Sequence, residues 1–390
     1  MILISRNKLE NFFLYVYAFF INFQEIKIFG LDFISIPKIS AFLYLIIFLP
    51  NLRNLDIKHY KRFLIPIYSF FIILTLINII NVNGSSLNFI DFTFFQNLIL
   101  FTCVIFHGQK DLNSINKAVL YLCLGTFVLA ILGYFQIGTT VDQFLLNEVS
   151  GERVTLFGDN SNIIGIRMSI SIIILISFFY HKFSKKLRFL FLVPIPLMIF
   201  TIAEGGSRLA FVSFFLSSLA FFILQKSKNM YQKIIIFLFF IFCSVLLYFF
   251  ISQYQFLLYR ILGTIFLGEV SGRDESFLVL IEIIKDNFLF GIGQTGYNLY
   301  NIGSPHNVIF EVLLYTGFFG FIFYFNFLYK LFKGAIKLFR SQGNITLVLL
   351  LIPISGLILT GQILDSKLVW FVFAYFVSII SCSKKKLIFK

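Results

Sequence analysis

One histidine in this chain could accept a proton during a reaction. The chain has four histidines, and three of them lie beside lysine and arginine residues at the ends of apolar segments: His59, His107 and His181. His306 instead opens an apolar segment at the opposite end, directly after Ser304 and Pro305. Serine is a favourable N-cap and proline suits the first helical position, so we expect His306 in the first turn of a helix. The helix dipole favours a neutral imidazole there, as a general base requires. The alternative is a histidine that only caps the helix or hydrogen-bonds a loop.

Two arginines could hold an anionic group such as a phosphate. Arg208 ends the short turn 204–208 and stands at a helix start, where free backbone N–H groups favour a phosphate. Arg273 follows Gly272 in a longer polar segment. A guanidinium binds phosphate oxygens with two donors, so either arginine is a candidate phosphate ligand. For Arg208 the alternative is a side chain that extends to lipid headgroups.

Further polar residues are candidates for substrate binding. Arg167 lies within an apolar segment, where a charge is costly and usually faces a cavity or a partner. Arg153 is a weaker candidate just before that segment, and Asn307 directly follows the candidate histidine. Tyr297, after the glycine-rich stretch 291–296, offers an aromatic face suited to sugars. The glycines could equally form only a flexible connection.

No metal or cofactor site is predicted. The carboxylates form no Asp-x-Asp pair and lie at no fixed spacing from a histidine. The four cysteines form no CxxC pair. The pattern GxGxxG at 291–296 follows no strand, so it implies no dinucleotide site. We therefore expect chemistry that needs neither a metal ion nor another cofactor.

The composition predicts a membrane protein. Of the 390 residues, 59% are hydrophobic and 13% are charged, and the mean hydropathy is +0.91. Soluble chains carry about 25% charged residues, so most of this surface must face lipid or other helices. The net charge of +14 indicates lysines and arginines in cytoplasmic loops and not a nucleic-acid partner.

The apolar segments predict an all-α, polytopic fold with about twelve membrane-spanning helices. The expected spans are 9–30, 34–52, 63–82, 89–107, 117–138, 162–180, 188–203, 207–224, 234–252, 306–329, 345–363 and 367–382. With both termini in the cytoplasm, every loop satisfies the positive-inside rule. We expect a single transmembrane domain over 1–390, with a long extracytoplasmic loop, 253–305, inserted between the ninth and tenth spans. Short helices are expected in this loop at 254–262 and 274–287, and a second long outer connection at about 139–161.

Several of these residues resemble a known signature. His306-Asn307, nine further residues and then Gly317-x-x-Gly320 match every position of the C-terminal signature of the O-antigen ligase and O-antigen polymerase superfamily. Four shorter patterns resemble its other loops and helix starts: Gly206-Ser207-Arg208, Ser271-Gly272-Arg273, Gly291-Ile292-Gly293 and Asp159-Asn160-Ser161-Asn162. The resemblance covers about 150–325. It departs at Phe277, since many members have a tryptophan in that region.

The resemblance implies a metal-independent, GT-C-like glycosyltransferase of the bacterial cytoplasmic membrane, whose donor is a glycan on undecaprenyl diphosphate. Arg208 and Arg273 would hold the diphosphate and His306 would deprotonate the acceptor hydroxyl, so we expect the three side chains to converge at the outer face. A direct displacement would invert the anomeric configuration. The implied partners are the donor, an acceptor glycan and membrane lipids, with a chain-length regulator protein as a further candidate. No nucleic acid is implied.

Several interpretations of the activity stay open. The chain could polymerise repeat units of O-antigen or capsule, it could be a ligase that transfers finished glycan to lipid A core, or it could be an oligosaccharyltransferase that acts on protein. The bias towards Phe, Ile, Leu, Asn and Lys is typical of an AT-rich genome, which is common in laterally moved antigen loci, and it favours a polymerase. A flippase or secondary transporter is the alternative from another class. Transporters usually show repeats and polar residues at the membrane midplane, whereas the polar candidates here cluster outside.

Overall fold

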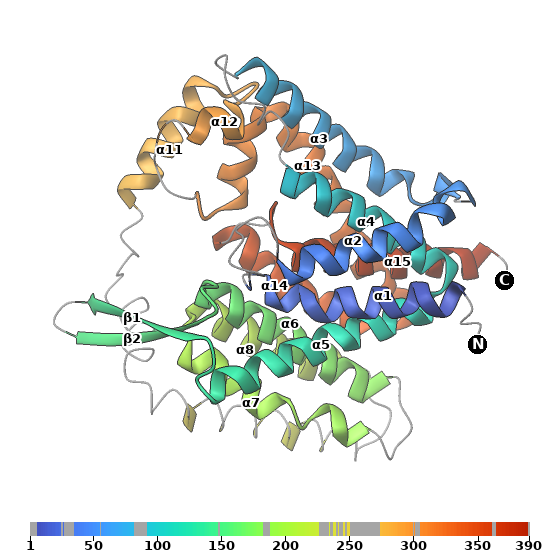
Figure 1. Ribbon diagram of the computed structural model, residues 1–390, viewed down its shortest axis with the longest axis vertical. Coiled ribbons are helices and arrows are strands. Elements are labelled where there is room, and N and C mark those ends of the chain that lie inside the picture. The colour runs from blue at the N-terminus through green and yellow to red at the C-terminus, as the bar shows by residue number, and fades with distance from the viewer. Residues whose placement is uncertain are drawn as a thin grey trace. The chain divides into compact units, whose positions relative to one another are not determined.

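The computed structural model is mostly helical in the part of the chain that it describes (Figure 1). The described residues are 6–24, 26, 35–54, 56–81, 92–146, 149–181, 188–225, 274–298, 300, 305–360 and 364–388, with isolated positions between 234 and 249. The chain divides into two compact units. The first unit comprises Met1–Phe48, Asn116–Glu269 and Phe339–Pro353, and the second comprises Leu49–Ile115, Val270–Leu338 and Ile354–Lys390.

The first unit is built around one enclosed helix, α6. Its helices are α1 (Arg6–Phe20), α2 (Ile36–Phe48), most of α5 (Leu112–Tyr134), α6 (Ser161–His181), α7 (Ile195–Glu204) and α8 (Arg208–Leu224), with short 3₁₀ helices η1 (Ile21–Phe23) and η4 (Arg188–Phe191). Helix α6 packs against α7 and α8. A Cβ atom added to Gly165 would lie 2.6 Å from the Cβ atom of Ala210, so glycine is what allows α6 and α8 to approach this closely. The Ser169 hydroxyl donates to the Ala210 carbonyl across the same contact, at 3.0 Å.

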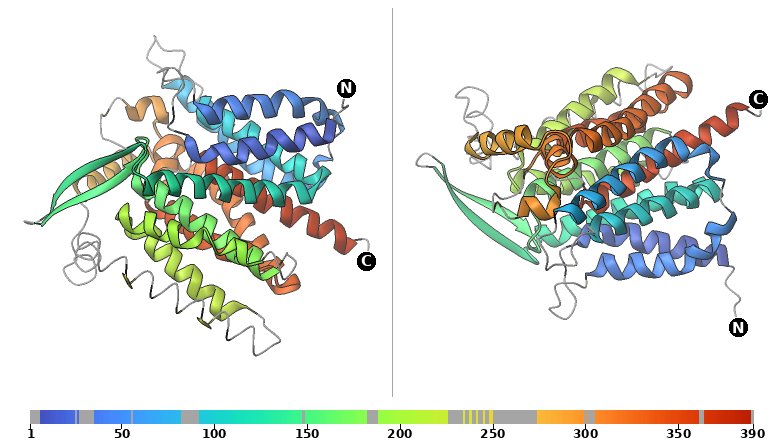
Figure 2. Two further views of the ribbon diagram at one scale, coloured as in Figure 1. Left: turned by 60° about the horizontal axis from the view of Figure 1, so that its bottom comes forward. Right: turned by 90° about the horizontal axis from the view of Figure 1, so that it is seen from above.

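A two-stranded antiparallel hairpin joins α5 to α6 and projects away from them (Figure 2). Strand β1 (Thr139–Leu146) pairs with β2 (Val149–Leu156), with Thr139 opposite Leu156. We expected only a long connection at 139–161. The sequence nevertheless carries β-branched residues near the base of both strands, and the hydroxyls of Thr140 and Thr155 are hydrogen-bonded across the pair. Such cross-strand pairs stabilise a hairpin.

The second unit has an aromatic core. It contains η2 (Leu49–Asn54), η3 (Ile57–His59), α3 (Lys61–Ile80), α4 (Phe92–Lys110), α11 (Asp274–Asp286), α12 (Gly293–Asn298), most of α13 (Val308–Gln342), the end of α14 (Ile345–Thr360) and α15 (Lys367–Ile388). Helices α4 and α15 pack together. The Trp370 ring of α15 packs edge-on against Phe94 and Phe101 of α4, with centroids 5.3 and 5.5 Å away. Its Nε1 atom donates to the Leu364 carbonyl at 2.8 Å, so this large ring is buried without losing a hydrogen bond.

The helices confirm the expected all-α, polytopic membrane fold. Within the described residues, five helices are long and apolar enough to cross a membrane, and shorter apolar helices accompany them. Each expected span other than 234–252 corresponds to a helix, and that span lies mostly outside the described residues. The expected span 188–203 is shortened, because a 3₁₀ turn precedes α7 and Pro194 stands at the N-cap. The short helix expected at 274–287 is α11, whereas 254–262 lies outside the described residues.

Candidate functional site

Arg208 stands at the start of α8, as the sequence predicted. Helix α7 ends at Glu204, and Gly206 takes a positive φ of 59° in the turn that follows. Ser207 is the N-cap of α8, because its hydroxyl oxygen accepts the N–H of Ala210 at 3.3 Å. Arg208 is half-buried in the first helical turn. The tight turn therefore places Arg208 in the first turn of α8.

The start of α6 lies next to the start of α8. Asn160 caps α6, since its Oδ1 atom accepts the N–H of Asn162 at 2.9 Å. The Ser207 hydroxyl donates to Asn162 Oδ1 at 3.0 Å, so the cap of α8 is hydrogen-bonded to the first turn of α6. The positive ends of two helix dipoles are thereby brought together near Arg208. This arrangement favours an anion more than a single helix start does.

The carboxyl group of Glu204 lies in the same turn and titrates near neutral pH. Burial raises the pKa of Glu204 from its ordinary value of 4.5 to about 7. A carboxyl that keeps its proton in part at pH 7 repels a neighbouring anion less than an ionised one does. The sequence analysis gave Glu204 no role. Its position at the end of an apolar helix was the signal that its pKa would rise.

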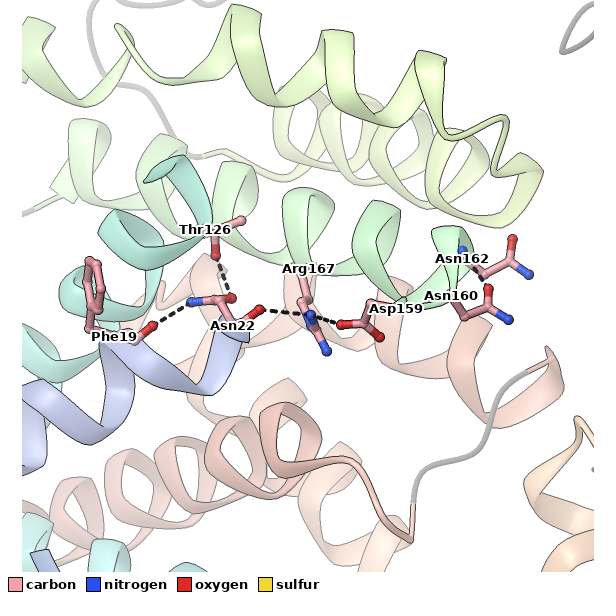
Figure 3. A network of polar contacts seen from close by, with 7 residues as sticks. All are labelled: Phe19, Asn22, Thr126, Asp159, Asn160, Asn162 and Arg167. Carbon is pink, nitrogen blue, oxygen red and sulfur yellow. Dashed lines mark hydrogen bonds and ion pairs between the residues drawn. The ribbon is translucent and has the colours of Figure 1, made fainter. Parts of the chain in front are cut away.

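Arg167 lies in a polar network inside the first unit (Figure 3). Its side chain is 1% exposed and forms an ion pair with Asp159, at the foot of the hairpin. Its Nη1 atom also donates to the Asn22 carbonyl at 3.0 Å. The Asn22 side chain in turn accepts from the Thr126 hydroxyl and donates to the Leu122 carbonyl, both at 2.9 Å. Arg167 therefore joins the ends of α1 and the hairpin to α6, and its assignment to substrate binding stays a prediction.

Two other candidate arginines are described in part or not at all. Arg153 lies on β2, with Asp142 opposite on β1, and its side chain is outside the described residues. Arg273 lies wholly outside the described residues. Substrate binding by both arginines stays a prediction.

His306 precedes its helix, and the expectation that it lies in the first turn is wrong. Helix α13 begins at Val308, and Asn307 caps it because its Oδ1 atom accepts the N–H of Ile309 at 2.8 Å. The expected cap, Ser304, is outside the described residues. His306 has a φ of 47°, in the left-handed region that few residues other than glycine adopt. Such conformations cluster at functional sites, because the surrounding structure must impose them.

Asn307 also connects α13 to α14. Its Nδ2 atom donates to the carbonyl of Leu359, near the end of α14, at 3.2 Å. One side chain thus caps a helix with its oxygen and joins a second helix with its nitrogen. These contacts are structural, and binding of substrate by Asn307 stays a prediction.

Gly317 breaks α13, although we expected a continuous span over 306–329. Its backbone angles, φ 58° and ψ −161°, are not helical. Glycines at this spacing often let another helix approach, but what approaches Gly317 is the backbone of a turn. A Cβ atom at Gly317 would lie 2.4 Å from the carbonyl carbon of Leu289, so a larger residue cannot fit. The local sequence did not reveal this break because its cause lies in the segment after α11.

The turn after α11 satisfies the backbone groups that the break leaves open. The N–H of Ile292 donates to the Leu314 carbonyl before the break, at 2.7 Å. The N–H of Phe318 after the break donates to the Phe288 carbonyl at 2.8 Å. Irregular backbone in an apolar region is tolerated only when its polar groups are paired in this way. Gly317 of the signature therefore lets this turn dock against the helix that follows His306.

Tyr297 is buried on α12. It is 5% exposed, and its ring packs against Tyr315 of α13 with centroids 5.9 Å apart. Burial and the nearby Glu311 carboxylate raise the pKa of Tyr297. Glu311, itself buried one turn into α13, was missed by the sequence analysis, although an acidic residue in an apolar span was a signal. Contact of Tyr297 with a sugar stays a prediction.

Two further expectations stay predictions. Arg208 and Arg167 belong to the first compact unit, and His306, Asn307 and Tyr297 belong to the second. The expected convergence of His306 with the arginines therefore stays a prediction. Within the described ranges, no three His, Cys, Asp or Glu side chains gather as metal ligands would. A reaction without a metal ion likewise stays a prediction.

These features define a helical, multi-pass membrane protein with candidate polar groups at its helix starts. Residues 193–325 match the family model described as O-antigen ligase. This segment includes Arg208, Tyr297, His306 and both glycines of the signature. The match confirms the resemblance to the O-antigen ligase and polymerase superfamily and supports a glycosyltransferase-like activity. No curated protein matches the chain.

Proposed function

We propose that this protein polymerises the repeat units of a surface polysaccharide, either O-antigen or capsule. It would transfer glycan from undecaprenyl diphosphate to an acceptor hydroxyl at the outer face of the bacterial cytoplasmic membrane. The observation that carries the proposal is His306, held at a positive φ directly before a capped helix and inside the matched segment. The composition bias is the reason to rank a polymerase first.

The proposed reaction needs only one proton acceptor and positive charge at the leaving group. Diphosphate is already a competent leaving group, so the enzyme mainly aligns the acceptor and stabilises the departing oxygen. His306 would take the proton of the acceptor hydroxyl while its oxygen attacks the anomeric carbon. The bond from that carbon to the phosphate oxygen would break, with its electron pair leaving on the diphosphate. Arg208 and Arg273 would neutralise that charge, and the sugar configuration would invert.

Substitution of His306 tests the proposal. His306→Ala should slow transfer by about a hundred-fold to ten-thousand-fold, because it removes the general base. His306→Asn is the matched control, since asparagine adopts a positive φ readily but does not accept the proton. Both variants should lose polymer while binding donor normally, as measured by a gel of surface glycan and by donor affinity of the purified protein. Polymer of normal length with either variant would contradict the role given to His306.

A ligase is the second candidate, because the matching family model is described as O-antigen ligase. The two activities differ in what remains on the cell when the gene is deleted. Loss of the glycan ladder with one repeat unit retained on the core indicates a polymerase. Complete loss of glycan from the lipid A core indicates a ligase and would contradict the first proposal.

The proposal includes an orientation with both termini in the cytoplasm. Lysines and arginines concentrate in the loops that this orientation leaves inside. Reporter fusions to each terminus should be active only as cytoplasmic reporters. A periplasmic signal from either terminus would contradict this orientation.

A further inference from the structure

An apolar crevice lies between α13 and α14 within the second unit. It has a volume of about 360 Å³. Its walls are Phe325, Leu328 and Phe332 of α13 and Ser355, Ile358 and Leu359 of α14. The two helices are joined by a short connection at 343–344, so they run antiparallel as neighbours. Leu359, near the end of α14, therefore lies towards the end of the crevice that faces the start of α13.

The crevice is connected to the segment that carries His306. Leu359 lines the crevice, and its carbonyl accepts the hydrogen bond from Asn307 at 3.2 Å. Asn307 directly follows His306 in the chain. A molecule with its reacting group at His306 and an apolar tail would thus find the crevice next to that group.

The crevice suits a long hydrocarbon chain that enters from the side. Leu359 is 57% exposed and Tyr329, which also lines the crevice, is 59% exposed, so the space opens at the surface of the helices. The lining offers few polar atoms, and the Tyr329 hydroxyl already accepts from Lys333 Nζ at 3.1 Å. A long tail could enter such an opening from the bilayer without threading through the protein.

We propose that the crevice between α13 and α14 holds the part of the donor's isoprenoid tail nearest to the diphosphate. This inference rests on the proposed function, because it assumes a donor whose diphosphate lies at His306. It extends that function by assigning a tail-binding surface and by making transfer dependent on tail length.

The test compares two donors that differ only in their tails. Ser355→Phe places a ring in the crevice, and Ile322→Phe is the control because Ile322 is exposed on α13 and does not line the crevice. Glycan transfer by the purified protein is measured with an undecaprenyl donor and with a donor whose diphosphate carries a methyl group in place of the isoprenoid tail. We expect Ser355→Phe to raise KM for the undecaprenyl donor about tenfold and to leave the methyl donor nearly unaffected, because the methyl donor has no tail to place in the crevice. Ile322→Phe should change neither KM.

The outcomes separate this inference from the proposed function. Normal transfer by the wild-type protein, with no tail-length effect in Ser355→Phe, would overturn the inference alone. No transfer by the wild-type protein from either donor would contradict the proposed function and the inference with it.

A second measurement applies even if Ser355→Phe does not fold. A photoreactive polyprenyl phosphate should crosslink the wild-type protein in the peptide that contains Ile358 and Leu359. Excess undecaprenyl phosphate should prevent the crosslink, and excess phospholipid should not. Equal competition by phospholipid would show that the crevice holds ordinary bilayer lipid and would overturn the inference.

Discussion

The region around the starts of α6 and α8 and the region around the break in α13 are held in different ways. In the first, polar side chains make the contacts: Arg167 with Asp159, and Ser207 with Asn162. In the second, the backbone of the turn after α11 pairs with the backbone on either side of Gly317. We therefore expect removal of a side chain to destabilise the first region, and addition of a methyl group to destabilise the second.

The largest expected effect is the loss of the Arg167 ion pair. Arg167→Met should lower the free energy of unfolding by about 3–5 kcal/mol, because it leaves the Asp159 carboxylate buried without its guanidinium. Arg208→Met is the control from the same unit, and it should cost less than about 1 kcal/mol while weakening donor binding. Thermal unfolding in detergent and donor affinity measure the two effects. Equal destabilisation by both variants would remove the distinction between a structural and a ligand-binding arginine.

The next effect concerns Gly317. Gly317→Ala should cost about 3 kcal/mol, because alanine at a positive φ is strained and its Cβ atom would meet the Leu289 backbone. Gly343→Ala is the control, since Gly343 has a φ of 68° and nothing within 4 Å of an added Cβ atom. It shares the positive φ of Gly317 without the clash. If the two variants unfold at the same temperature, the contact between Gly317 and the turn does not stabilise the second region.

The smallest effect compares the two helix caps. Ser207→Ala and Asn307→Ala should each cost about 1 kcal/mol, because each leaves an N-terminal N–H group of its helix without an acceptor. Asn307→Ser should restore the cap of α13 without restoring the bond to the Leu359 carbonyl. Its stability in detergent should therefore approach that of the wild-type protein. A serine variant as unstable as the alanine variant would assign the whole effect to the bond with α14.

Features fixed by neighbouring residues were predicted from the sequence. The turn before Arg208 follows from two glycines and a capping serine, and all three lie within four residues of it. The start of α6 and the extent of α11 follow from similar local patterns. The position of His306 was predicted wrongly because two local caps competed. Ser304 fitted the rule, but the asparagine side chain at Asn307 is the one that accepts the helix N–H group.

Features fixed by distant residues were not predicted. The carbonyl partner of Arg167 is Asn22, which lies 145 residues away in the chain, so no local pattern identifies it. The break at Gly317 depends on Leu289, and glycine in an apolar helix is equally consistent with helix packing. The hairpin had a local signal in its threonines and valines, but its short strands lie in a chain dominated by helical segments.

The docking of the turn against Gly317 also bears on how the chain enters the bilayer. Synthesis runs from the N-terminus, so residues 287–292 leave the ribosome before the helix whose open backbone groups they satisfy. The donors and acceptors for the break are then already present when α13 emerges. We expect α11, the turn and the first half of α13 to be inserted together, as one cotranslational unit. A ribosome stalled once Phe318 has left its exit tunnel would already carry the complete bend.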